Sequence, residues 1–224
     1  MNKYSKKLKK QVAKYKKWLL KYHPEINENN DNGEIIGPNF EEMIDLAIEY
    51  IREIKFYDSS DEDIDAIFYC IARDNEAEVL ADCLSEQYEW FSKLAEACIE
   101  TNYTTAKWQF AKRLPKYKND DKIANMIYDY IKIDDEYTQK MSLFSLAEIY
   151  PDTAEKYAID FWERDKYKEN PYSEEYQKIM VLHVLEKIKS NKLSYYIEEA
   201  KKSDYVYLKE NAEEIEKTMQ SNNL

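Results

Sequence analysis

The chain has 224 residues, a net charge of −12 and a charged fraction of 35%. This length allows either one domain with a substantial core or one elongated array of helical repeats. Only two glycines occur, Gly33 and Gly37, where an average sequence has about 7% glycine. Hairpin turns, strand bulges and phosphate-binding loops all draw on glycine, so the composition speaks against β-rich folds and nucleotide sites and favours an all-α protein.

The cysteine pattern and the short apolar runs indicate the cellular compartment of the protein. Cys70, Cys83 and Cys98 match no metal-binding or redox spacing, and an odd number of cysteines indicates reduced, mostly buried thiols. We find no secretory signal and no run that is long and apolar enough to span a bilayer. The expectation is therefore a cytoplasmic protein.

Charge is distributed unevenly along the chain. The first 22 residues hold nine lysines and no acidic residue, whereas residues 25–89 hold twenty acidic residues against three basic ones, a net charge of −17. Residues 90–224 are close to balanced, with a net charge of −4. The acidity is thus a property of residues 25–89.

The first predicted helix covers residues 3–22 and is amphipathic. Its apolar stripe repeats every three or four residues and comprises Leu8, Val12, Tyr15, Leu19 and Tyr22. We interpret this helix as docked on the core, with its lysines facing the acidic segment that follows. The alternative, that it binds an anion, stays open because basic amphipathic helices also lie on anionic membranes or nucleic acid. Residues 25–38 then form a polar loop.

Further helices are expected in close succession after this loop. Asn39 is the expected N-cap of a helix that ends at about residue 57, with Met43, Leu46, Ala47, Tyr50 and Ile54 facing inward. A helix over 60–73 follows a capping segment at Ser59 and Ser60, with Ile64, Ile67, Phe68 and Ile71 on its apolar stripe. Two more are expected over 75–84 and 86–100, the second with Tyr88, Phe91, Leu94, Ala95 and Cys98 inward.

The second half alternates regularly between helices and short turns. We expect helices over 102–116, 119–132, 134–150, 152–164, 172–189, 191–202 and 204–219. The connections are mostly only a few residues long, and such short connections make consecutive helices pack antiparallel as neighbours.

Two stretches in this half are alike, and a third is a weaker copy. Tyr103 and Tyr137 each open a Tyr-Thr helix and lie 34 residues apart, and Tyr176 lies 39 residues further on. A period of this size is typical of stacked helical repeats. The stretches 106–115 and 140–151 resemble the second helix of HEAT repeats, with a basic residue near the start, small residues in the middle and Leu or Ile before the turn.

The resemblance implies a fold but no chemistry. It implies a right-handed α-solenoid of antiparallel helical hairpins, with about 10–12 helices and the second helices lining a concave face. We describe the chain as a single helical-repeat domain over 1–224, in which 1–57 supply the basic helix, the acidic loop and one helix, and 58–220 supply the HEAT-like hairpins. Pro115 and Pro151 depart from the pattern by replacing the usual turn glycine, and so does His183, where smaller residues sit in the other copies.

The residues offer little support for catalysis. His23 and His183 have no plausible Ser or Cys nucleophile in pattern, so a catalytic triad is not indicated. The run Asp61 to Asp65 mimics the opening of a calcium loop, but Ala66 and Ala72 replace the required Gly and Glu. We therefore expect no enzyme, no metal and no cofactor.

The favoured function is a non-enzymatic protein-binding scaffold whose acidic surface recognises a basic protein partner. Small acidic helical proteins of this kind resemble bacterial immunity proteins, which occlude a toxin, and some of these are HEAT-like. The candidate acidic contacts, which crowd at one helix entrance, are Asp58, Asp61, Glu62, Asp63 and Asp65. On the repeat face the candidates are Lys107, Lys112, Tyr137, Lys140 and Glu148.

Two alternatives remain. A structural adaptor in a larger complex would use the groove instead of the acidic segment. A HEAT-like DNA glycosylase ranks lowest, because a phosphate cradle needs an excess of Lys and Arg and residues 90–224 are slightly acidic. We expect neither a nucleic-acid nor a membrane partner, and the sequence does not indicate the oligomeric state.

Overall fold

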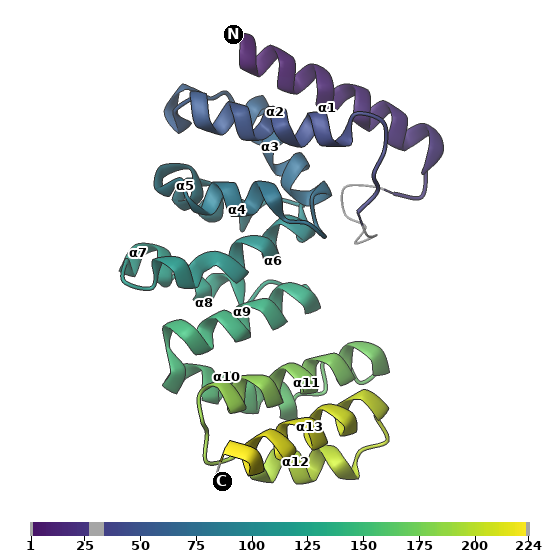
Figure 1. The fold of residues 1–224 in the computed structure, drawn as a ribbon, viewed down its shortest axis with the longest axis vertical. Coiled ribbons are helices and arrows are strands. Elements are labelled where there is room, and N and C mark those ends of the chain that lie inside the picture. Colours follow the sequence, from purple (N-terminus) through teal and green to yellow (C-terminus); the bar gives the residue numbers. More distant parts are fainter. Residues whose placement is uncertain (1, 27–33, 223–224) are drawn as a thin grey trace. The chain divides into compact units, whose positions relative to one another are not determined.

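The structure is a computed structural model that describes residues 2–26 and 34–222. Within these residues it contains thirteen α-helices, two 3-10 helices and no strand, which confirms the all-α prediction (Figure 1). The helices group into two compact units, Met1–Lys116 and Tyr117–Leu224. In the part that the structure describes, no helix is long and apolar enough to cross a bilayer.

Unit 1 contains the first six α-helices. Helix α1 packs on α2 and α3, α3 packs on α6, and α4 contacts α2 and α5. These helices are α1 (Lys3–Tyr22), α2 (Phe40–Glu53), α3 (Asp61–Arg73), α4 (Val79–Ser85), α5 (Tyr88–Cys98) and α6 (Thr104–Arg113). A 3-10 helix, Phe56–Asp58, connects α2 to α3, and another, Leu114–Tyr117, follows α6.

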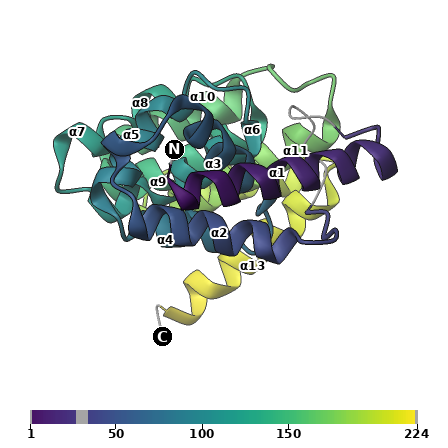
Figure 2. The same cartoon turned by 90° about the horizontal axis from the view of Figure 1, so that it is seen from above.

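Helix α1 has the predicted bounds and buries the predicted stripe. Its N-cap is Asn2, whose side chain accepts a hydrogen bond from the Ser5 amide. Figure 2 shows α1 alongside α2 and across α3, which are the two helices it contacts. The stripe residues Leu8, Val12, Tyr15 and Leu19 are at most 5% exposed. Tyr22 was predicted to be inward but is 57% exposed, because it lies in the last turn, beyond the surface that α1 buries.

Helix α2 begins after Asn39 as predicted but ends earlier than predicted. Asn39 does precede it, but its backbone is left-handed (φ 66°) and its side chain makes no capping bond. The helix ends at Glu53 instead of about residue 57, and the 3-10 turn takes the remaining residues. Met43, Ala47 and Tyr50 are buried as predicted, together with Phe40, Ile44 and Ile51, whereas Leu46 and Ile54 are only half-buried.

Helices α4 and α5 begin later than predicted. The backbone of Glu78 is left-handed (φ 54°), so α4 starts at Val79 instead of residue 75. The buried Asp74 carboxylate replaces a local cap by accepting a 2.7 Å hydrogen bond from the Leu80 amide. Tyr88 was predicted to be inward but is the first residue of α5 and is 54% exposed. Phe91, Leu94, Ala95 and Cys98 are buried as predicted.

Unit 2 contains α7 to α13. Helix α9 packs on α8, α10 and α11, and α13 packs on α11 and α12. The bounds are α7 (Asp121–Ala124), α8 (Ile127–Tyr130), α9 (Glu136–Ile149), α10 (Pro151–Glu163), α11 (Pro171–Lys187), α12 (Leu193–Lys202) and α13 (Val206–Asn222). The helix predicted over 119–132 is therefore two single turns, because the amides of Met126 and Tyr128 bond to carbonyls three residues back and tighten the chain there.

Candidate partner-binding site

The N-terminus of α3 carries the acidic residues that the sequence singled out. Ser60 is the N-cap, and it forms a capping box with Asp63 in which each residue accepts a bond from the other's backbone amide. Asp61, Glu62 and Asp63 fill the first turn, where carboxylates interact favourably with the positive end of the helix dipole. Local helix chemistry therefore accounts for part of this acidic cluster without any partner.

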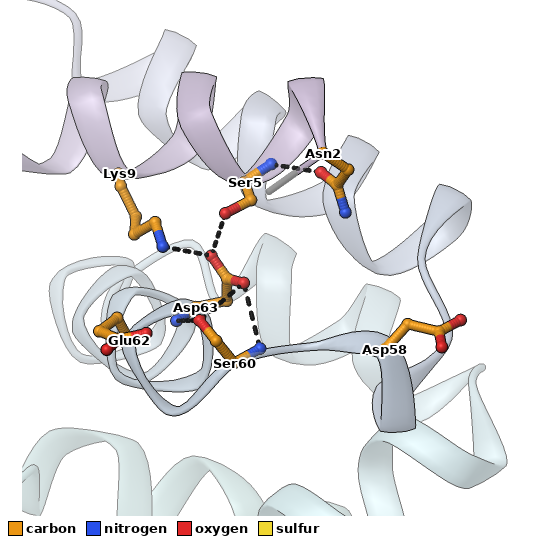
Figure 3. A pocket seen from close by; sticks show the side chains of 7 residues that line it. All are labelled: Asn2, Ser5, Lys9, Asp58, Ser60, Glu62 and Asp63. Atoms are coloured by element: carbon orange, nitrogen blue, oxygen red, sulfur yellow. Dashed lines mark hydrogen bonds and ion pairs between the residues drawn. The ribbon is translucent and has the colours of Figure 1, made fainter.

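Helix α1 docks on this N-terminus through Asp63 (Figure 3). The Ser5 hydroxyl donates a 2.6 Å hydrogen bond to Asp63 Oδ1, and Lys9 Nζ lies 3.3 Å from the same oxygen. Burial by itself raises the pKa of the Asp63 carboxyl, but the bonds from Ser5 and Ser60 and the charge of Lys9 outweigh it, so this pKa lies below its ordinary value. Asp63 is 4% exposed, and it thus holds α1 to α3 instead of facing solvent.

A pocket of about 420 Å³ opens beside this contact. It is lined by Asn2, Ser5, Lys9, Asp58, Ser60, Glu62 and Asp63. In Figure 3 Asp63 points toward Ser5 and Lys9, while Asp58 lies apart on the preceding 3-10 turn. Glu62 is exposed, and a hydrogen bond with Ser60 lowers the pKa of its carboxyl. The rim of the pocket therefore carries ionised carboxylates at neutral pH.

A second pocket, of about 310 Å³, includes other residues of the same helix entrance. Asp65 accepts a 2.8 Å hydrogen bond from the Tyr103 hydroxyl, which joins α3 to the start of α6. The lining residues are Asp61, Ile64, Asp65, Phe68, Glu100, Thr101, Asn102 and Tyr103. The five acidic residues predicted from the sequence thus divide between two pockets that share the start of α3.

The structure also adds residues that the sequence did not single out for this site. Ser5 and Lys9 come from α1, and Glu100 comes from the turn after α5. Ser5 and Asp63 are 58 positions apart, so no local pattern indicates their contact. For Glu100 the sequence offers only a weak signal of a role in the site, namely an acidic residue near the end of a predicted helix.

The predicted groove residues lie in both units. In unit 1 Lys107 is buried on α6, and Lys112 is exposed and forms a 2.7 Å ion pair with Glu78. In unit 2 the buried Lys140 pairs with Glu136 at 3.0 Å and lies over the Tyr137 ring, 4.9 Å from its centroid. Glu148 pairs with Lys187 at 2.9 Å. Whether residues of α6 and α9 line one common groove stays a prediction.

The described part of the chain assembles no group of three or more His, Cys, Asp or Glu side chains suited to a metal ion. His183 is half-buried, and its Nε2 lies 3.0 Å from the Asn211 side-chain oxygen. None of the three cysteines, all of which the structure describes, forms a disulfide, and Cys70 and Cys98 are buried. The carboxylates at the α3 entrance can bind cations and basic side chains.

No protein-family model, curated protein or solved structure matches this chain. The resemblance to HEAT repeats and to immunity proteins therefore stays a prediction from the sequence, and the site is interpreted from its own geometry.

Proposed function

We propose that this chain is a non-enzymatic binding scaffold that recognises a basic protein partner through an acidic surface at the entrance of α3. This acidic surface consists of Asp58, Asp61, Glu62 and Asp65. The observation that carries the proposal is that all four side chains are exposed and that none forms an ion pair with a residue that the structure describes. Their carboxylates are thus available to Lys or Arg side chains of another protein.

Helix stability alone does not account for this surface. The helix dipole favours acidic residues only within the first turn, which covers Asp61 and Glu62 but not Asp58, Asp65 or the nearby Glu100. A field of one sign steers an oppositely charged partner and speeds its association. The two pockets at the helix entrance, about 420 and 310 Å³ in volume, offer concave places for long basic side chains.

The finer proposal follows the sequence resemblance. The helices form a right-handed HEAT-like α-solenoid of antiparallel hairpins, and the chain is a cytoplasmic immunity protein that occludes a basic toxin. The all-helical structure, the near absence of glycine and the 34-residue repeat of Tyr103 and Tyr137 support this proposal.

The test measures how fast the chain associates with the purified protein that is encoded by the gene next to its own. It compares the intact chain with a charge-reversed variant. The variant Asp58→Lys, Asp61→Lys, Glu62→Lys spares Asp63, whose replacement would disturb the α1 contact. We expect association to slow by at least about tenfold, with the effect shrinking in high salt. The matched control, Glu41→Lys, Asp45→Lys, Glu49→Lys, makes the same charge change on the exposed face of α2 and should slow association less.

Two results would count against the proposal. Unchanged binding by the α3 variant, with an unchanged circular dichroism spectrum, would remove the acidic surface from the interface. Failure of the intact chain to bind the neighbouring product would remove the immunity assignment.

The second candidate function, a structural adaptor, is favoured by a tyrosine cluster on unit 2. Tyr137, Tyr172 and Tyr207 are exposed by 41%, 65% and 53%. Lys140 lies over both Tyr137 and Tyr176, and the Tyr172 and Tyr176 rings are 4.5 Å apart. Tyrosine is enriched where proteins bind one another. If Tyr137→Ala abolished binding while the α3 variant left it intact, the adaptor would replace the acidic-surface proposal.

A further inference from the structure

Helix α1 carries a row of exposed lysines on the side opposite its buried stripe. Successive members are one, three or four positions apart, so they share one face of the helix over about 27 Å at 1.5 Å per residue. This lysine row consists of Lys3, Lys6, Lys7, Lys10, Lys14, Lys17 and Lys21. The row is distinct from Lys9, whose ammonium faces Asp63.

The lysine row forms no ion pair with the described part of the acidic segment that follows it. None of the seven forms an ion pair with a described residue, and the interactions of Lys3, Lys14 and Lys21 are with the Tyr4 ring, Gln11 and the Tyr22 ring. The predicted docking of α1 is confirmed, and Lys9 faces Asp63 as expected, whereas none of these seven lysines pairs with an acidic side chain that the structure describes.

The row also disfavours the helix that bears it. Like charges three and four residues apart repel each other, and Lys3 and Lys6 lie near the positive end of the helix dipole, where the first turn has no acidic residue. Nothing in the packing of α1 calls for these charges, since its buried stripe is formed by other residues. A feature that costs stability without a local gain indicates a function.

Exposed apolar side chains accompany the C-terminal end of the row. Leu20, Tyr22 and Ile36 are 64%, 57% and 72% exposed. Ile36 is held beside this end because Gly37 lies against the Trp18 ring so closely that a Cβ there would be 2.2 Å from a ring carbon. The Trp18 and Tyr22 rings are in turn 5.8 Å apart. We call Leu20, Tyr22 and Ile36 the apolar tip, since the first two lie in the last turn of α1, which also bears Lys21, and Ile36 precedes Gly37, which contacts Trp18.

We infer that this face of α1 docks on a bilayer that contains anionic lipids. The lysine row supplies attraction to the headgroups, and the apolar tip enters the interfacial region, where aromatic and aliphatic side chains are favoured. The charge alone would equally suit nucleic acid, but the apolar tip gains nothing from phosphates, and the row contains no Arg for bidentate contacts. This replaces the expectation of no membrane partner, which assumed that the acidic segment neutralises these lysines.

The docking differs from that of a free amphipathic helix. The main apolar stripe of α1 is already buried in unit 1, so only the tip can enter the interface. We therefore expect reversible binding that weakens strongly with salt.

The experiment is co-sedimentation of the full chain with phosphatidylcholine vesicles, with and without phosphatidylserine. We expect binding only with phosphatidylserine, and weaker binding at higher salt. The variant Lys7→Gln, Lys10→Gln, Lys14→Gln should lower the partition coefficient by about a hundredfold, since each basic residue near an anionic surface contributes roughly fivefold. The control Lys118→Gln, Lys156→Gln, Lys217→Gln removes three exposed lysines from unit 2 and should change it little.

A second variant tests the tip. Leu20→Ser with Ile36→Ser keeps every charge and should weaken vesicle binding while preserving its salt dependence. The inference fails if the intact chain does not bind phosphatidylserine vesicles, if the two triple variants behave alike, or if the chain binds single-stranded or duplex DNA more tightly than vesicles at the same salt concentration.

Discussion

Replacing Asp63 by Ala tests whether α1 is held to α3 as the structure indicates. The change removes one half of the capping box and leaves Ser5 and Lys9 without their shared acceptor. A lost cap costs about 1 kcal/mol, and a lost hydrogen bond to a charged group costs about 1.5–3 kcal/mol. The ion pair adds little, because Lys9 is 30% exposed. We expect a loss of about 3 kcal/mol in the free energy of unfolding.

Urea denaturation followed by tryptophan fluorescence measures this loss. Three of the four tryptophans, Trp18, Trp90 and Trp108, lie in unit 1, so the signal reports mainly on the unit that is perturbed. The control is Asp61→Ala, which removes a neighbouring carboxylate that is exposed and unpaired among the described residues, and it should cost less than about 1 kcal/mol. Equal losses for the two variants would refute the assignment of Asp63 as the anchor of α1.

The difference in the free energy of unfolding between the intact chain and Asp63→Ala should change with pH in a defined direction. The folded-state pKa of Asp63 is lowered, so the ionised form stabilises the folded state. This contribution is complete above the unfolded-state pKa of about 3.9 and is lost as pH falls through the lower folded value. The gap between the intact chain and Asp63→Ala should therefore be constant near neutral pH and shrink only in acid.

Two further predictions concern close packing. Gly37→Ala would place a Cβ too close to the Trp18 ring, so the ring must shift. We expect the free energy of unfolding to fall by about 1–3 kcal/mol and the fluorescence emission of Trp18 to change. An unchanged melting temperature would contradict the close approach. Burial raises the pKa of the Cys70 thiol, and Cys98 is also buried, whereas Cys83 is half-buried. Alkylation followed by mass spectrometry should therefore modify Cys83 first, and modification of Cys70 in the folded chain at the same rate would contradict its burial.

The helices were predictable where a long apolar period and a cap coincide. The sequence placed the helix over 3–22 and the helix after Ser60 to within one residue of their ends. Apolar residues repeated every three or four positions mark both helices, and acidic residues in the first turn mark the second. Both are signals that lie within the helix itself. The errors occurred where local signals compete. Glu78 adopts a left-handed backbone conformation, which delays the start of α4 in a way that its residue type does not reveal.

The sequence predicted which acidic residues gather at the candidate site, but not which of their side chains are exposed. The sequence located five acidic residues at one helix entrance, yet it could not separate Asp63 from its neighbours. Asp63 is buried because Ser5 and Lys9 approach it from a helix far away in the sequence. In the same way, Lys107 and Lys140 were expected to line a groove but are buried. Periodicity tells which face of a helix turns inward, but not which neighbouring helix covers the polar residues at its edge.

The ion pair between Lys9 and Asp63 bears on both proposals. Lys9 pairs with Asp63, whereas the seven lysines of the lysine row form no ion pair with a residue that the structure describes. Had the two segments neutralised each other, neither the lysine row nor the acidic surface could attract a partner. Because neither the lysine row nor the acidic surface forms ion pairs with described residues, each can attract its own partner, and exposed charges act mainly within a Debye length of about 8 Å at physiological salt. Reversing Asp58, Asp61 and Glu62 should therefore leave phosphatidylserine binding in place, while removing Lys7, Lys10 and Lys14 should leave binding of a basic protein in place. If either substitution abolished both activities, the two surfaces would have to be one.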